Sequence, residues 1–329
     1  MAHSIAGTAR SISDWRTSIG GMDLLTDALA VGGVRGTVGA RIEAGGTWGL
    51  SWSTLNGATF YAVTSGTAWL TVAGDEPRQL MPGDVVLLTN GTPHGISSAP
   101  GVPLTPCPGC NADEVMADGS VVRLGTGEVQ THILGATYAY DPTVNTQVMA
   151  VLPTVLHIKA DNGGTCLDDT VRLLSRELAY PQLAIGYVLN RLVDIALVQL
   201  LRVWLAGGPP EVRGTWLSAL DDPVVGAALA TLHEEPARAW TTESLAAKLT
   251  ISRSTLTRRF RAAVGTAPAD YLTRWRMDLA AVRLRDTDDT LDAIARSVGY
   301  TSVYAFSRAF RRSRCQAPGQ FRTAARTSA

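Results

Sequence analysis

The chain has 329 residues, more than one compact core usually organises, so length alone predicts two domains. Its net charge of zero hides an asymmetry. Up to Leu220 there are 12 Lys and Arg against 18 Asp and Glu, and after it there are 17 against 11, so the parts carry net charges of −6 and +6. Only the basic C-terminal part therefore suits binding to nucleic-acid phosphates.

The sequence carries no sign of a membrane span or an export signal. The most apolar run, from Tyr187 to Leu205, contains two arginines, an aspartate and a glutamine, which favours a buried or paired helix. The first residues lack a basic leader followed by a long apolar core. We therefore expect a cytoplasmic protein that makes no membrane contact.

Residues 1–166 are expected to form a small β-barrel. Short apolar runs such as "ATFYAVTSG", "TAWLTVAGDEP" and "DVVLLTNGTPHG" recur at intervals typical of all-β domains. Turn residues, including Gly66, Gly74 and Gly83, separate these runs.

Residues 167–214 are expected to form a helical association segment and a linker. Helical spacing of apolar residues predicts two helices that are interrupted around Pro181, and "AGGPPEVRG" after them has the composition of a linker. The apolar face from Leu189 to Leu201 either packs against the barrel or pairs with a second subunit. We expect a homodimer, with this helix as its contact.

Residues 220–325 are expected to be entirely helical, which makes the whole chain an α+β multidomain protein. Helix-start residues stand at Pro223, Thr241 or Thr242, Ser252, Pro268, Thr290 and Ser302, and helix-ending glycines stand at Gly265 and Gly299. A helix-turn-helix pattern occurs twice, at about 242–263 and about 290–312, and the capping serines of the second helices are 50 residues apart.

Packing within each helix-turn-helix unit predicts which side chains face outward. Leu256 and Phe260 in the first unit, and Phe306 and Phe310 in the second, must bury against the preceding helix. The outward side of each second helix then suits the DNA major groove. The expected DNA-contacting residues are Arg253, Ser254, Thr257, Arg258, Arg261, Val303, Tyr304, Ser307, Arg308 and Arg311. The alternative is a helical domain with a merely solvated basic face.

The strings "LAAKLTISRSTLTRRFRAAVGTAPADYLTRWRMDLAAVRLRDT" and "IARSVGYTSVYAFSRAFRRSRCQAPGQFR" resemble the AraC/XylS family of bacterial transcription regulators. The resemblance implies that the long helix around Trp275 holds two recognition helices in successive major grooves, roughly 34 Å apart. Two residues depart from the family pattern: Ala267 replaces a capping serine and Cys315 replaces a glycine. Cys315 must therefore adopt a glycine's backbone angles, or its loop must shift.

The string "GDVVLLTNGTPH" resembles the second cupin motif, with Gly83, Gly91 and His94 in place and Thr89 where proline is usual. A cupin barrel is thus implied, as in the subgroup of AraC-type regulators that carry one. Tyr61 occupies the expected position of a metal-binding histidine, and no H-x-H is present, so a cupin enzyme is not expected.

The C-x-x-C pair that follows His94 leaves three interpretations open. Cys107, Cys110 and His94 form a set that binds zinc well if they converge, with His132 or water as a fourth ligand. Alternatively the two thiols form a redox switch, or they only pack in a loop that prolines stiffen.

The N-terminal domain is expected to sense a signal. Trp52, Tyr61 and Trp69 could line an effector pocket in the barrel, although core packing is the commoner role of such aromatics. These features predict a regulator that binds double-stranded DNA and responds to a small molecule, metal or oxidant. If it is an activator, RNA polymerase is a further partner. The rival interpretations are a cupin enzyme fused to DNA-binding helices and an architectural DNA binder without a ligand.

Overall fold

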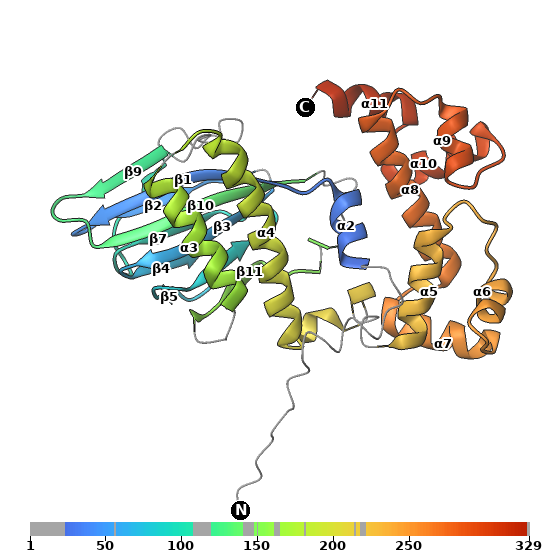
Figure 1. Ribbon diagram of the computed structural model, residues 1–329, viewed down its shortest axis with the longest axis horizontal. Helices are drawn as coiled ribbons and strands as arrows, with labels where there is room; N and C mark the ends of the chain where they lie inside the picture. The colour runs from blue at the N-terminus through green and yellow to red at the C-terminus, as the bar shows by residue number, and fades with distance from the viewer. Residues whose placement is uncertain are drawn as a thin grey trace, which may run out of the picture. The chain divides into compact units, whose positions relative to one another are not determined.

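The computed structural model describes residues 24–55, 57–107, 120–140, 148–149, 151–160, 165–180, 182–213, 215–217 and 222–327. They divide into two compact units (Figure 1). One comprises Val34–Tyr140 and Leu152–Gly208, and the other comprises Pro209–Ala329 together with Met1–Gly33 and Asp141–Val151. The division at Gly208 falls within the predicted linker.

The first unit is built on two sheets. The larger has the strand order β11-β6-β3-β10-β1-β9 and the smaller has the order β5-β4-β7-β2-β8. The strands are β1 (Arg35–Gly45), β2 (Gly49–Trp52), β3 (Ala58–Ser65), β4 (Ala68–Val72), β5 (Arg78–Leu80), β6 (Val85–Leu88), β7 (His94–Ser97), β8 (Thr105–Pro106), β9 (Ser120–Gly125), β10 (Thr131–Ala139) and β11 (Val155–Ile158).

Side chains that alternate between the two faces of each strand determine which residues form the barrel core. Ile42 on β1, Leu70 on β4 and Ile96 on β7 are among the buried residues of one cluster that fills the interior. Their neighbours in sequence face the other side of each sheet, because successive side chains of a strand alternate. The predicted barrel and the run boundaries at Gly66 and Gly83 are confirmed.

The second cupin motif is explained by two local contacts. Gly91 has φ +64°, and a Cβ there would collide with the Leu55 carbonyl, so only glycine fits. Thr89, where the motif usually has proline, is fully buried and its amide donates to Thr154 O at 3.1 Å. Proline has no amide hydrogen, so threonine adds a bond that ties this loop to the segment before β11.

Two helices cover an outer face of the larger sheet, α3 (Thr165–Ala179) against β3 and α4 (Ile185–Ala206) against β1 (Figure 1). The break predicted around Pro181 is confirmed. Of the two roles predicted for the apolar face of α4, the structure has packing on the barrel and not pairing with a second subunit, because Leu189 and Leu197 are only 2% and 3% exposed within the chain itself. That face packs against α3 and the barrel, and so it is not available to a second subunit.

The second unit is helical. Its C-terminal helices are α5 (Pro223–Glu234), α6 (Thr242–Lys248), α7 (Arg253–Val264), α8 (Pro268–Asp286), α9 (Leu291–Ser297), α10 (Val303–Arg314) and α11 (Pro318–Thr327), after a short 3-10 turn, η2 (Pro210–Val212). Predicted capping bonds are present: Thr241 accepts from Ser244 N and Ser252 from Thr255 N. The last helix, α11, was not predicted; its Phe321 completes the core beneath α8 and α10.

A helix near the N-terminus, α2 (Leu24–Gly32), also belongs to this helical unit, whereas the sequence assigned residues 1–166 to the barrel. It packs on α8, and Asp27 accepts a hydrogen bond from His233 at 3.1 Å. His233 also stacks on Trp275, with ring centroids 3.8 Å apart. These partners are more than 200 residues from Asp27 in sequence, so no local pattern could connect them.

Candidate nucleic-acid interface

The second helix of the first helix-turn-helix unit, α7, is anchored by its buried side. Leu256 and Phe260 are fully buried, and α7 packs on α5, α6 and α8. Ser252 caps its first turn, while Gly265 ends it in the left-handed region at φ +75°. The helix is therefore held at both ends, with its other face exposed.

Four of the five predicted α7 residues are exposed, namely Arg253, Ser254, Arg258 and Arg261, and Thr257 is half-buried. Arg258 and Arg261 have no ion-pair or hydrogen-bond partner among the described residues. Arg253 instead pairs with Glu243 of α6 at 2.8 Å. The side-chain donors of Arg258 and Arg261 are thus open to an external acceptor.

Arg259 lies beside these arginines in sequence but has a structural role. Its guanidinium donates to both carboxylate oxygens of Asp222, at 2.9 and 2.8 Å. Asp222 also caps α5 by accepting from the amides of Val224 and Val225. Burial works to raise the pKa of Asp222, but these hydrogen bonds outweigh it and hold the pKa below its usual range.

The second helix of the second helix-turn-helix unit, α10, repeats this arrangement. Phe306 and Phe310 are fully buried, and Ser302 caps the helix. Of the predicted residues, Tyr304, Arg308 and Arg311 are exposed, whereas Val303 and Ser307 are half-buried. The Arg308 guanidinium lies 5.7 Å from the ring centroid of Tyr304, so an aromatic ring and a cation share one outward face.

The end of α10 is tied to the long helix α8 by a buried ion pair between Arg314 and Asp278. Burial raises the pKa of Asp278 to about 6, although Arg314 works in the opposite direction. Cys315 follows as the C-cap, in the left-handed region at φ +56°. The cysteine thus adopts the angles of a glycine, as one of the two sequence alternatives required. At the other departure, Ala267 begins α8 without a side-chain cap.

In the barrel, both ring nitrogens of His94 are engaged. Its Nδ1 lies 2.7 Å from Thr92 O, which can only accept, so Nδ1 carries the hydrogen and Nε2 accepts from Tyr61 Oη at 2.9 Å. Burial lowers the pKa of His94 to about 4, which keeps the ring neutral. Tyr61, at the position where the cupin resemblance led us to expect a metal-binding histidine, thus supplies a hydrogen bond to His94.

This geometry bears directly on the zinc hypothesis. His94 offers no free nitrogen, and within the described ranges no three His, Cys, Asp or Glu side chains are grouped to hold a metal ion. Cys107 is disulfide-bonded, and Cys110 lies outside the described residues. Zinc binding stays a prediction, while a bonded Cys107 matches the oxidised form of the predicted thiol switch.

Two other predicted residues lie apart from this group. His132 alternates with the core residue Ile133 on β10, so it faces the outside of the barrel, whereas His94 contacts the core residue Tyr61. Trp69 likewise alternates with the core residues Ala68 and Leu70, and therefore does not share a pocket with Trp52 and Tyr61. Trp52 does stack on His94, with ring centroids 5.0 Å apart.

Comparisons with known proteins agree with this architecture. A family model described as a cupin matches residues 23–206, and one described as a helix-turn-helix domain matches residues 245–324. A putative AraC-like transcription regulator from Streptomyces lividans is 37% identical over 92% of this chain and 98% of its own length. The HTH-type transcriptional regulator MtrA from Neisseria gonorrhoeae is 26% identical, with the same coverage of both chains.

A solved DNA-binding domain, that of AdpA in complex with a target DNA, is 32% identical, with a TM-score of 0.30, and covers 31% of this chain and 93% of that one. None of the described helices has the length and apolarity that a membrane crossing requires. The cupin model spans more than half of the chain, and the Streptomyces lividans relative aligns over nearly all of it. The chain therefore belongs to the AraC-like transcription regulators, which are DNA-binding proteins and not enzymes.

Proposed function

We propose that this DNA-binding regulator controls promoters in response to a small molecule, metal or oxidant that its N-terminal domain senses. The observation that carries the DNA-reading part is the pair of outward helix faces on α7 and α10. Each presents arginines that have no ion-pair or hydrogen-bond partner among the described residues, including Arg258 and Arg308, on a helix fixed by buried aromatic residues. Arginine's planar fork suits both phosphate oxygens and the acceptor edge of guanine.

The test of this proposal is promoter binding by the full-length protein and its variants. We expect Arg258→Ala and Arg308→Ala each to weaken binding to a specific site by about 1–3 kcal/mol if the side chain reads a base edge. If the side chain contacts only a phosphate, the variant should bind specific and non-specific DNA more weakly to the same degree. The number of counterions released on binding, measured from the salt dependence of the affinity, should then fall by about one. Binding should also weaken steeply as salt concentration rises.

The matched control is Arg172→Ala, which removes an arginine that is also exposed but lies on α3 of the N-terminal unit. It should leave promoter binding unchanged. Wild-type affinity in the Arg258→Ala, Arg308→Ala double variant would exclude our placement of the recognition faces.

We also propose that the protein acts as a homodimer, and that as an activator it would contact RNA polymerase. The buried face of α4 does not support the dimer, but exposed apolar side chains nearby do. Tyr180, Leu183 and Tyr187, around the turn between α3 and α4, are 73%, 99% and 73% exposed. Exposed apolar groups gathered in this way are a common mark of an association surface.

Zinc and thiol chemistry remain two separate proposals for the signal. The disulfide at Cys107 supports an oxidant, because a sulfur in a disulfide is not the thiolate that zinc binds. Metal analysis of untagged protein under reducing conditions tests the zinc alternative. Near-stoichiometric zinc that is lost in Cys107→Ser would support it.

A further inference from the structure

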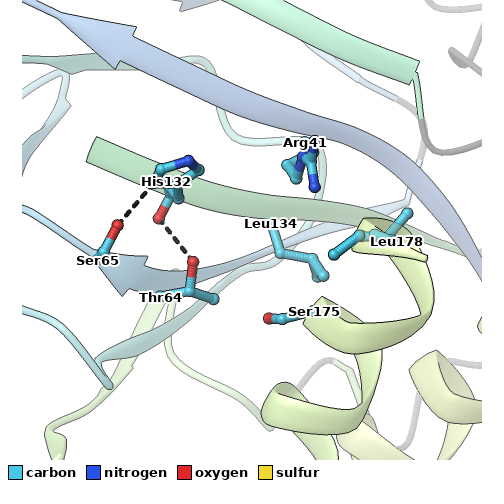
Figure 2. Close-up of a pocket in the computed structure, with 8 residues that line it drawn as sticks. Arg41, Thr64, Ser65, His132, Leu134, Ser175 and Leu178 are labelled. Carbon is cyan, nitrogen blue, oxygen red and sulfur yellow. Dashed lines mark hydrogen bonds between the residues drawn. The ribbon is translucent and has the colours of Figure 1, made fainter. Parts of the chain in front are cut away.

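The N-terminal unit has a cavity of about 280 Å³ on the outer side of its larger sheet, away from the packed barrel core. Strands β1, β3 and β10 form its floor, and the C-terminal half of α3 forms its opposite wall (Figure 2). The lining residues are Arg41, Thr64, Ser65, His132, Leu134, Ser175, Leu178 and Ala179. Its volume approaches the lower end of the range for small-molecule sites.

The sheet side of this cavity carries excess positive charge. Arg41 Nη2 pairs with Glu43 Oε1 at 2.6 Å, but the other oxygen of Glu43 lies 3.3 Å from Arg123 Nε. One carboxylate is thus shared by two guanidinium groups. The local set retains one uncompensated positive charge, on a side of the cavity where Arg41 is only a quarter exposed.

Arg41 also has an unused donor. Its Nε is fully buried and finds no hydrogen-bond acceptor in the part of the chain that the structure describes. Buried donors in folded proteins are nearly always paired, either within the protein or with a bound molecule. The protein therefore leaves this guanidinium only partly satisfied, and an anionic group in the cavity would meet its excess charge.

His132 and Ser65 extend the polar wall. His132 Nδ1 lies 2.7 Å from Ser65 Oγ, and Thr64 Oγ1 donates to the carbonyl oxygen of His132 (Figure 2). The ring's other nitrogen, Nε2, has no partner among the described residues. A second polar contact is therefore open beside Arg41.

The rest of the lining is apolar. Leu134 comes from the sheet and Leu178 and Ala179 from α3, while the hydroxyl of Ser175 is already donated to Val171 O at 2.8 Å. One charged anchor on an otherwise apolar wall suits a small molecule with an anionic end and a hydrocarbon body. A carboxylate fits better than a phosphate, because the cavity has only a few free donors and a phosphate has more oxygens that need them.

We propose that this cavity binds a small monocarboxylate, with its carboxylate on Arg41 and its hydrocarbon body against Leu134, Leu178 and Ala179. This site deepens the proposed sensing function, on which its regulatory meaning rests. Since α3 closes the cavity and packs on α4, the bound acid would hold α3 to the sheet.

Binding to the full-length protein is tested by calorimetry with straight-chain acids from butanoate to octanoate and with benzoate, each beside its uncharged amide. We expect at least one acid to bind saturably and its amide to bind at least tenfold more weakly. Arg41→Met should reduce the affinity at least tenfold. Arg78→Met is the matched control, because it removes an exposed arginine of the same unit that pairs with Asp75 and neither lines the cavity nor contacts Glu43, and it should bind as the wild type does.

A second variant guards against misfolding of Arg41→Met. Ser175→Phe fills the cavity from the α3 side without altering the charges, and it should abolish binding while circular dichroism stays that of the wild type. The site is excluded if no acid binds, if amides bind equally well, or if folded Arg41→Met or Ser175→Phe protein retains wild-type affinity. Promoter binding is measured in parallel. If an acid binds at Arg41 but promoter affinity does not change, the cavity is a binding site without a sensing role. If promoter affinity still responds to the acid in Ser175→Phe, the acid is sensed at another site.

Discussion

At the residue scale, the internal duplication places a cysteine and a glycine in equivalent positions. Gly265 ends α7 at φ +75°, and Cys315 ends α10, 50 residues later, at φ +56°. Left-handed geometry costs a residue with a Cβ about 1–2 kcal/mol, and glycine avoids that cost. At this helix end, the second unit therefore carries backbone strain that the first does not.

We accordingly expect Cys315→Gly to raise the free energy of unfolding of the helical unit by about 1 kcal/mol. Urea denaturation of the full-length protein, followed by circular dichroism, measures it. Gly265→Ala is the reciprocal control, and it should destabilise the unit by a similar amount. Equal stability of Cys315→Gly and the wild type would mean that the cysteine compensates elsewhere for its backbone angle.

The buried imidazole of His94 predicts a pH dependence of barrel stability. Burial lowers its pKa from 6.5 to about 4, so between these values the unfolded chain binds a proton that the folded barrel does not. Stability should therefore be complete above about pH 6.5 and fall as the pH drops toward 4, by about 3 kcal/mol in all.

Denaturation of the barrel at pH 7 and pH 5 measures this loss. In His94→Gln, which keeps an amide in place of the ring, the baseline stability will change, but the part of the pH slope due to His94 should disappear. An unchanged slope in that variant would assign the pH dependence to other groups.

Residue roles could be predicted from the sequence where they depend on local spacing. The capping residues and the outward arginines follow from the helical period, and the structure has them at those positions. By contrast, Arg259 bonds to Asp222 and Tyr61 bonds to His94, and these pairs lie 37 and 33 residues apart. Nothing in local spacing distinguishes Arg259 from Arg258, so only the fold separates a structural arginine from an available one.

At the element scale, periodicity predicted the helices well but could not say what covers them. The sequence of the apolar face of α4 is equally compatible with packing on its own barrel and with packing on a second subunit. In the structure this face packs on the barrel. Helix α2 was missed because its partner helix α8 is more than 200 residues away. Helix α11 was missed because "PGQFRTAART" is polar and has a single large apolar residue, Phe321, to mark its buried side.

The corrected packing of α4 changes the test for dimerisation. Leu197→Arg places a charge in the domain's own core, so it should unfold the N-terminal unit instead of dissociating a dimer. Leu183→Glu with Tyr187→Glu changes only exposed side chains, and it should convert the dimer to a monomer without loss of helicity.

Light scattering at micromolar concentration determines the oligomeric state of both variants. Leu104→Glu serves as the control, because it alters an exposed leucine on the sheet side of the same unit and should leave the dimer intact. A wild-type monomer would remove the dimer proposal, and a dimer that survives both glutamates would move the contact to another surface.

At the scale of the whole molecule, the charge division is the feature that connects sequence to function. Most of the acidic part folds into the barrel unit, and the basic part folds into the helical unit that contains α7 and α10. Net charge is counted directly from the sequence and acts over long distances. The nucleic-acid-binding part could therefore be predicted before any contact was known. What the signal is, by contrast, depends on cavities and sulfur chemistry that composition does not specify.

The thiol switch is a prediction about the whole molecule, because it requires a sulfur in the barrel unit to alter DNA binding by the helical unit. We expect promoter affinity to differ between protein treated with dithiothreitol and protein treated with mild peroxide, since the disulfide at Cys107 is present in only one of these states. Fluorescence anisotropy with labelled promoter DNA measures both. In Cys107→Ser the difference should vanish, because no disulfide can form at that position.

Cys166 and Cys315 provide the matched controls. Both are exposed and free, so peroxide reaches them too, and Cys315 lies at the end of a recognition helix. Cys166→Ser and Cys315→Ser should each retain the full redox response. If Cys315→Ser abolishes it instead, oxidation acts directly on the DNA-binding helices and the barrel cysteines take no part. If wild-type affinity is the same in both redox states, the disulfide has no regulatory role, and among the proposed signals only zinc and a small molecule remain.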